Sequence, residues 1–204
     1  VTAEGVSPFP SEVTTQMVLN FLSGGAAVNV LARVAGATVY VADIGVAHDW
    51  SEEQKHPRLL VKKVRQGTRN MAHEPALTRA EAVAAIVAGA EVADQLESDG
   101  AKVLAVGEMG IGNTTPATAL LCVFTGLHPA EVTGQGTGLD NKGIQHKAEV
   151  IRKALEARQA QAADPLGALA AVGGLEIAGM AGYMLRAAAL RCGPWPGRPA
   201  DRRA

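Results

Sequence analysis

The sequence has few aromatic residues and no excess of either charge. Phe, Trp and Tyr make up 3% of the 204 residues, whereas hydrophobic residues make up 48% and glycine occurs 23 times. So many small residues favour an α/β domain in which helices and a sheet pack closely. The 19 basic and 20 acidic side chains exclude the electrostatic footprint of a nucleic-acid-binding protein and a polybasic membrane anchor.

Cysteine and long hydrophobic runs are also scarce. Cys122 and Cys192 are far apart and show no metal-binding or redox spacing. We interpret them as reduced thiols, with a disulfide as the alternative. The sequence shows no apolar segment of membrane-spanning length, and no signal-peptide pattern opens the chain at Val1. We therefore expect a soluble cytoplasmic protein with no membrane contact.

A glycine-rich segment, GEMGIGNTTP at residues 107–116, is the most informative feature. It follows the apolar run 103–106 and precedes the apolar run 117–123, an order that predicts a buried strand, a loop and a helix. Glycines let the backbone approach a ligand closely, and free N–H groups at a helix start attract an anion. Glu108 stands at the strand's carboxyl end, where open α/β sheets place their chemistry.

A second glycine loop, at residues 132–140, has glycine at alternate positions and precedes a predicted helix over 142–161 that carries Lys147. Its many N–H groups predict a phosphate nest. Taken singly, either loop is as typical of a tight turn as of a binding site. Glu108, at a strand end inside a glycine loop, favours a functional acid over a structural one, whereas Lys147 alone is typical of a solvated surface charge. Neither loop has the Walker A or dinucleotide spacing. Together, a carboxylate in one loop and a lysine after the other favour a phosphorylated small molecule as ligand.

The remaining chain predicts alternating helices and strands. We expect helices from Ser11 and over 26–34, strands over 39–46 and 59–64, and a helix behind the Thr78–Glu81 capping box. The expected buried face of that helix consists of Ala82, Val83, Ile86, Val87, Ala90 and Ala93. Further helices start at Asp164-Pro165 and after Gly173-Gly174. The succession predicts a parallel sheet with right-handed crossovers.

Other polar residues are less informative. Asp43, near the end of its predicted strand, and Glu176 are equally consistent with structural and functional roles. The five histidines are scattered without metal-ligand spacing, and we assign them no role.

The segment 107–115 closely resembles the signature of nicotinate-nucleotide–dimethylbenzimidazole phosphoribosyltransferases, which activate the lower ligand of cobalamin. Further family-like segments follow in family order and together cover roughly residues 3 to 190: EVTTQM at 12–17, GGAAVNVLAR at 24–33, DIGV at 43–46, GTGLD at 136–140 and GGLEIAGMAG at 173–182. The resemblance implies a Rossmann-like parallel sheet flanked by helices, in which the family's small helical domain is largely missing.

The resemblance also implies a reaction. Family members transfer phosphoribosyl from nicotinate mononucleotide to 5,6-dimethylbenzimidazole, giving nicotinate and α-ribazole 5′-phosphate with inversion from β to α. No metal and no cofactor are required, and the partners are these small molecules. A base must take a proton from the attacking benzimidazole.

Motif matching carries the family's site residues onto this chain. The resemblance implies that nicotinate mononucleotide contacts Gly107, Gly110, Gly112, Asn113, Thr114, Thr115, Gly136, Gly138, Lys147 and Glu176. It implies that the benzimidazole faces Ser7 and Gln16. The family's principal base is a glutamate beyond the GGLEI segment and has no counterpart here, so Glu108 becomes the substitute base.

The end of the chain departs from the family pattern. Residues 1–191 are interpreted as an incomplete phosphoribosyltransferase-like α/β domain, and residues 192–204, with three prolines and no apolar periodicity, as a disordered or out-of-frame tail. A missing strand would expose an apolar sheet edge, and family members dimerise, so we expect a homodimer.

Three functional hypotheses remain: an active transferase, a catalytically impaired module that binds nucleotide or benzimidazole, and a generic phosphate-binding domain.

Overall fold

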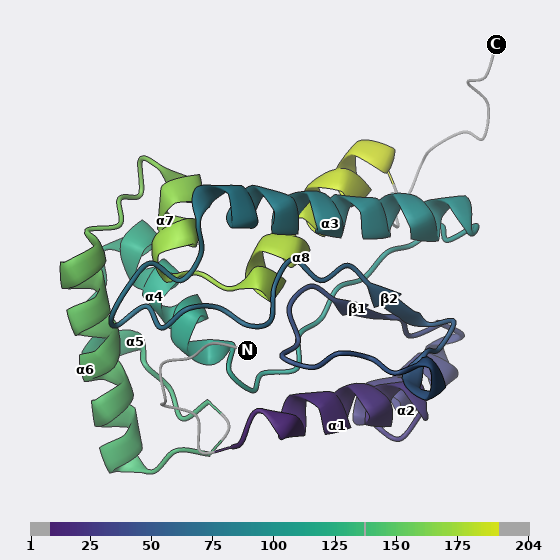
Figure 1. Cartoon of the computed structure of the whole chain (residues 1–204), viewed down its shortest axis with the longest axis horizontal. Coiled ribbons are helices and arrows are strands. Elements are labelled where there is room, and N and C mark those ends of the chain that lie inside the picture. The colour runs from purple at the N-terminus through teal and green to yellow at the C-terminus, as the bar shows by residue number, and fades with distance from the viewer. Residues whose placement is uncertain (1–8, 137, 192–204) are drawn as a thin grey trace.

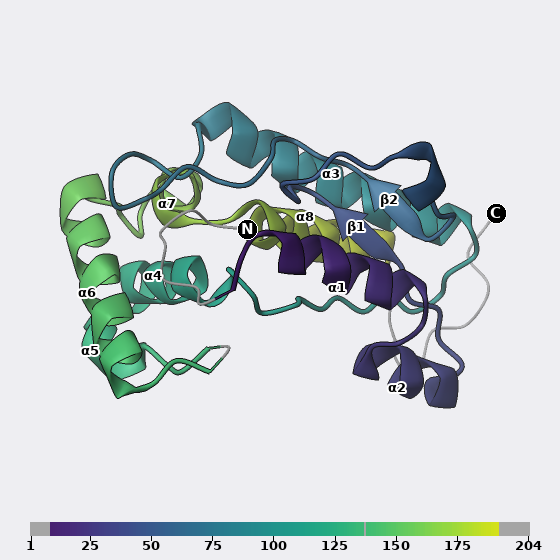
Figure 2. The same cartoon turned by 60° about the horizontal axis from the view of Figure 1, so that its bottom comes forward.

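The computed structural model describes residues 9–136 and 138–191 (Figure 1). It contains a small parallel sheet of β1 (Val41–Asp43) and β2 (Leu59–Val61), with Val41 opposite Leu59. The connection between them holds only the 3-10 turn η1 (Glu52–Gln54). Helices flank this sheet (Figures 1 and 2), so the predicted α/β class with a helix-flanked parallel sheet is confirmed.

Two short helices begin the described chain, α1 (Glu12–Leu22) and α2 (Ala27–Ala35). Gly24 separates them because it adopts a left-handed φ of +82°, which few other residues tolerate. The stretch Glu12–Ala35 has a mean hydropathy of 1.4 over a membrane-sized window, yet this break divides it into helices of 11 and 9 residues. A single span needs about 20 continuous helical residues, so neither helix crosses a bilayer alone.

The long helices α3 (Arg79–Ser98) and α8 (Leu175–Leu190) lie along each other (Figures 1 and 2). The predicted capping box is confirmed: the Thr78 side chain accepts from the Glu81 N–H, and the Glu81 carboxylate accepts from the Thr78 N–H.

The predicted buried face of α3 was partly wrong, because Val83 and Val87 are exposed. The buried side chains are instead small ones, together with Val92 and Leu96. The helix turns this face toward α8 because the two backbones approach at Gly89, where branched side chains would hold them apart.

A second group of helices comprises α4 (Thr114–Thr125), α5 (Pro129–Val132), α6 (Asn141–Arg158) and α7 (Pro165–Val172). The side chain of Asp140 caps α6 by accepting from the Gly143 N–H, and Asp164 caps α7 in the same way. Ala119, Ile151 and Leu169 join these helices to the main core.

The strand predicted over 103–106 was wrong for the described structure. The segment begins with a bend at Val103, continues without regular secondary structure and lies outside the two-stranded sheet, and Val103 is 60% exposed. An extended segment becomes a strand only when a neighbour pairs with its backbone, and no described segment does so here. The predicted strand 39–46 also shortens to three residues. Cys122 is a buried free thiol, whereas Cys192 and the predicted tail lie outside the described residues.

Candidate functional site

Lys147 is a buried cation, and no anion is buried beside it in the part of the chain that the structure describes. It lies in the second turn of α6, and only 2% of the residue is exposed. Its Nζ donates to Thr114 Oγ1 at 2.8 Å, and no carboxylate of the described residues pairs with it. Burial therefore lowers the pKa of the Lys147 ammonium from its ordinary value.

A second source of positive potential faces this ammonium, because Thr114 is the first residue of α4. The N–H groups of Thr114 and Thr115 lie in the first helical turn, where they have no intrahelical acceptor. The Asn113 side chain does not cap them. A helix N-terminus and a buried ammonium repel each other unless an anion lies between them. The arrangement is suited to hold a phosphate.

The second glycine loop reaches the same place. Gly136 has φ +56°, and a Cβ there would lie 2.8 Å from Thr114 Oγ1 and 3.4 Å from Lys147 Nζ. Only glycine fits this contact without strain. Two loops that are far apart in the sequence thus meet around one lysine.

Glu176 joins the other side of the α4 N-terminus. Its Oε1 accepts from Asn113 Nδ2 at 2.9 Å. A Cβ on Gly174 would lie 2.4 Å from this oxygen, so the carboxylate occupies the space that a side chain at Gly174 would fill. The sequence interpretation treated Gly174 as a helix breaker and missed that it makes room for a carboxylate. Glu176, two residues later, was the feature that could have indicated this role.

Glu108 lies near this carboxylate. The residue is exposed, and its carboxylate accepts a hydrogen bond from the Gly110 N–H. Partial desolvation of the Glu108 carboxyl raises its pKa, and the negative charge of Glu176 raises it further. Hydrogen bonds from the N–H groups of Gly110 and Met109 lower the pKa, but the net shift is upward. An acid with a raised pKa is suited to exchange a proton with a bound substrate.

The other predicted site residues are distributed as follows. Gly110, Gly112 and Gly138 have left-handed φ angles of +95°, +74° and +104°. Gly107 borders open space, whereas Thr115 is buried. Gln16 is exposed on α1 and has no hydrogen bond to this cluster, and Ser7 lies outside the described residues.

Asp43, for which the sequence left two roles open, has a structural environment. It is fully buried and accepts from the Trp50 indole N–H and the Val46 N–H, each at 2.7 Å. Lys63 Nζ lies 3.4 Å from Asp43 Oδ2, the oxygen that accepts from Trp50. These bonds fix the loop after β1. The side chain of Leu175, at the start of α8, packs against Gly45 of that loop.

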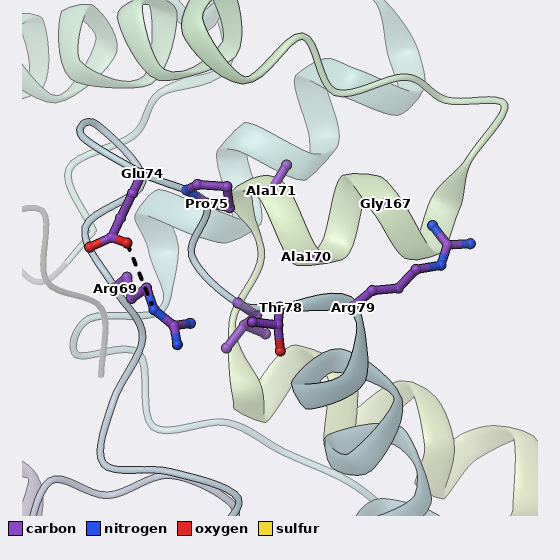
Figure 3. Close-up of a pocket in the computed structure, with 9 residues that line it drawn as sticks. Arg69, Glu74, Pro75, Thr78, Arg79, Gly167, Ala170 and Ala171 are labelled. Carbon is purple, nitrogen blue, oxygen red and sulfur yellow. Dashed lines mark ion pairs between the residues drawn. The ribbon is translucent and has the colours of Figure 1, made fainter.

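A hollow of about 430 Å³ lies between the start of α3 and α7 (Figure 3). Its two arginines already have partners: Arg69 pairs with Glu81 and Arg79 with Asp164, each at 2.7 Å. The Arg69 hydrogen bond lowers the pKa of Glu81 to about 2. With both cations satisfied, this hollow lacks the uncompensated charge found around Lys147.

The chain is similar to known proteins of one family. A family model described as phosphoribosyltransferase matches residues 1–193. A nicotinate-nucleotide–dimethylbenzimidazole phosphoribosyltransferase of Chlorobaculum tepidum is 53% identical over 190 residues, which cover 93% of this chain and 53% of that protein. An enzyme of the same name from Salinispora tropica is 52% identical over 202 residues, covering 94% of this chain and 56% of its own length.

A solved structure shows the same similarity in three dimensions. The crystal structure of CobT from Thermus thermophilus superposes with a TM-score of 0.85 at 47% identity, covering 92% of this chain and 55% of that one. The chain thus spans about half the length of the relatives it matches. The chain belongs to the nicotinate-nucleotide–dimethylbenzimidazole phosphoribosyltransferase family.

Proposed function

We propose that the chain binds nicotinate mononucleotide and transfers its phosphoribosyl group to 5,6-dimethylbenzimidazole, with the nucleotide phosphate held by Lys147 and the two glycine loops. The observation that carries the proposal is the buried Lys147 ammonium at the α4 N-terminus, which has a hydroxyl partner but no carboxylate partner among residues 9–136 and 138–191. A phosphate there accepts from the ammonium and from the N–H groups of Thr114 and Thr115.

The remaining proposed contacts follow from this placement. With the phosphate beside Gly136 and Lys147, the nucleotide extends along the segment 107–113 toward Glu108 and Glu176. Gly107, Gly110, Gly112, Asn113, Thr115 and Gly138 complete the proposed nucleotide contacts, and Ser7 and Gln16 the proposed benzimidazole contacts.

The proposed step is a direct displacement at the ribose C1′. The lone pair of one benzimidazole nitrogen forms a bond to C1′ while the bond from C1′ to the nicotinate nitrogen breaks. The electron pair of the breaking bond stays on the nicotinate nitrogen and neutralises the pyridinium ring. The proton on the other benzimidazole nitrogen passes to the Glu108 carboxylate, whose raised pKa favours holding it. Attack from the face opposite the leaving group inverts the anomeric centre from β to α.

Titration calorimetry with nicotinate mononucleotide tests the phosphate site. Lys147→Met removes a charge-assisted hydrogen bond worth about 1.5–3 kcal/mol, so the Kd should rise by about 10- to 100-fold. Lys153→Met is the matched control, because that lysine is on the same helix but is 66% exposed and pairs with Glu149. Nicotinate riboside, which lacks the phosphate, should bind both variants equally. Equal affinity of Lys147→Met and the unmodified chain for the mononucleotide would refute the assignment.

Catalysis is tested separately. The chain is incubated with nicotinate mononucleotide and dimethylbenzimidazole, and α-ribazole 5′-phosphate is sought by mass spectrometry. Product that disappears in Glu108→Gln supports transfer with Glu108 as the base. Binding without product supports the second candidate, a module that holds the ligands without turnover. The absence of binding to either ligand contradicts both.

We also propose a homodimer that works in the cytoplasm. The exposed apolar side chains Val28, Leu31 and Val34 of α2 provide a surface that association would bury. A monomeric mass by light scattering at micromolar concentration would contradict the dimer.

A further inference from the structure

Asn113 precedes α4 but does not cap it. Asparagine is among the residues that cap helices best, because its side-chain oxygen accepts from an N–H group of the first turn. The caps Thr78 and Asp140 do this with extended backbones, at ψ angles of 159° and 176°. Asn113 instead has φ −95° and ψ −38°, in the helical region, and its side chain makes no capping bond. A residue well suited to cap a helix is thus held in a conformation that prevents it.

Only one amide at the start of α4 suits a side-chain cap. A cap residue accepts from the N–H of the second or third helical residue, and the third residue of α4 is Pro116, which has no N–H. The second is Thr115, whose N–H has no acceptor among residues 9–136 and 138–191. This N–H is also one of the two that the proposed phosphate site uses. Capping by Asn113 and binding of phosphate therefore compete for the same donor.

Glu176 explains why Asn113 does not cap. Its Oε1 accepts from Asn113 Nδ2 at 2.9 Å, across 63 positions of sequence. Glu176 lies in the first turn of α8, where the helix dipole stabilises a carboxylate. A Cβ on Gly174 would lie 2.4 Å from the same oxygen, so the glycine leaves room for it. The acceptor is therefore fixed by α8, and it bonds the Asn113 amide to α8 rather than to α4.

We propose that Glu176 is a positioning residue that keeps the N-terminus of α4 open for the nucleotide phosphate, by holding the Asn113 side chain away from the cap. The inference rests on the proposed function, because the phosphate is that of nicotinate mononucleotide beside Lys147. Without the Glu176 acceptor, Asn113 adopts the extended backbone of an ordinary cap, and its Oδ1 accepts from the Thr115 N–H. The phosphate must then displace that bond before it binds.

Two substitutions separate the acceptor from the charge. Glu176→Gln loses the charge but retains an acceptor at the same length, whereas Glu176→Met loses both, and all three side chains have similar helix propensities. NMR of the ligand-free protein detects the cap directly. We expect Glu176→Met to shift the Asn113 Cα resonance toward extended values and to slow hydrogen exchange of the Thr115 amide about fivefold, the factor expected for a typical cap. Glu176→Gln should leave both signals unchanged.

Titration calorimetry with nicotinate mononucleotide gives the second readout. Glu176→Met should raise the Kd about fivefold relative to Glu176→Gln, which has lost the same charge. In a chain that already carries Asn113→Ala, no cap can form, so the two Glu176 substitutions should give the same Kd. Nicotinate riboside, which lacks the phosphate, should bind Glu176→Met and Glu176→Gln equally.

Faster exchange of the Thr115 amide in Glu176→Met would overturn the proposal, because a bond that merely orders the segment loosens it when lost. A difference between the two Glu176 substitutions that persists with Asn113→Ala would also overturn it. If Glu176→Met does not fold, as judged by circular dichroism, Asn113→Ser replaces it. Serine caps well without an amide to donate to Glu176, so equal nucleotide affinity of Asn113→Ser and Asn113→Ala would then overturn the proposal.

Failure of this inference is distinct from failure of the proposed function. An unmodified chain that does not bind nicotinate mononucleotide refutes the proposed function. Unchanged NMR signals in Glu176→Met, which need no nucleotide, refute the positioning role of Glu176 alone.

Discussion

Gly89→Ala is expected to destabilise the protein although alanine favours helices. A Cβ at this position of α3 would lie 1.8 Å from the carbonyl oxygen of Gly179 on α8. Relaxing that contact to about 3.3 Å requires the helices to separate by more than 1 Å, since both partners are backbone. Overpacking of this kind costs about 1–3 kcal/mol, and we expect the upper end, offset by about 1 kcal/mol of helix propensity. The net loss should be about 2 kcal/mol.

Urea denaturation followed by circular dichroism measures this loss. Ala84→Gly, on the exposed face of the same helix, is the control, because it reports the propensity difference without the contact. Displacement of α8 also moves Glu176 relative to Asn113, so Gly89→Ala should weaken nicotinate mononucleotide binding while Ala84→Gly should not. A stabilised Gly89→Ala variant would refute the reasoning, because propensity would then outweigh the backbone contact.

Three further changes test other parts of the structure. Asp43→Ala removes the buried acceptor of the Trp50 indole and should cost about 3–5 kcal/mol of unfolding free energy, whereas Asp43→Asn should cost less; thermal unfolding that ranks the two equally would contradict this. The depressed pKa of Glu81, about 2, contributes stability that is present above its unfolded value near 4.5 and is lost as the pH falls toward 2. Arg69→Met should therefore flatten the decline of stability in that window, and an unchanged pH profile would exclude the ion pair as its cause. Gly136→Ala introduces a Cβ against the phosphate-binding groups at φ +56°, so nicotinate mononucleotide affinity should fall in calorimetry; unchanged affinity would remove this loop from the site.

Local signals in the sequence predicted the ends of elements well. The predicted caps Thr78 and Asp164 each begin a helix in the structure, because a capping bond depends on residues only three positions apart. Ser11 and Asn113 also precede helices but make no capping bond with their side chains, and the cap at Asp140 was not predicted. The helix break predicted at Gly24 is also present in the structure, because the backbone of this glycine is left-handed. The strand prediction over 103–106 was wrong because strand formation depends on a distant partner that composition does not reveal.

The sequence by itself determined the helix-flanked α/β class, the helix caps at Thr78 and Asp164, the two glycine loops and the family. These depend on local propensity and on residue order. Tertiary structure alone decided that Lys147 is buried beside Thr114 and Gly136, that Glu176 holds Asn113, and that Asp43 is structural. Burial and pairing are properties of residues brought together across long sequence separations, so a lysine that reads as a surface charge becomes an uncompensated cation only when α4 and α6 pack together.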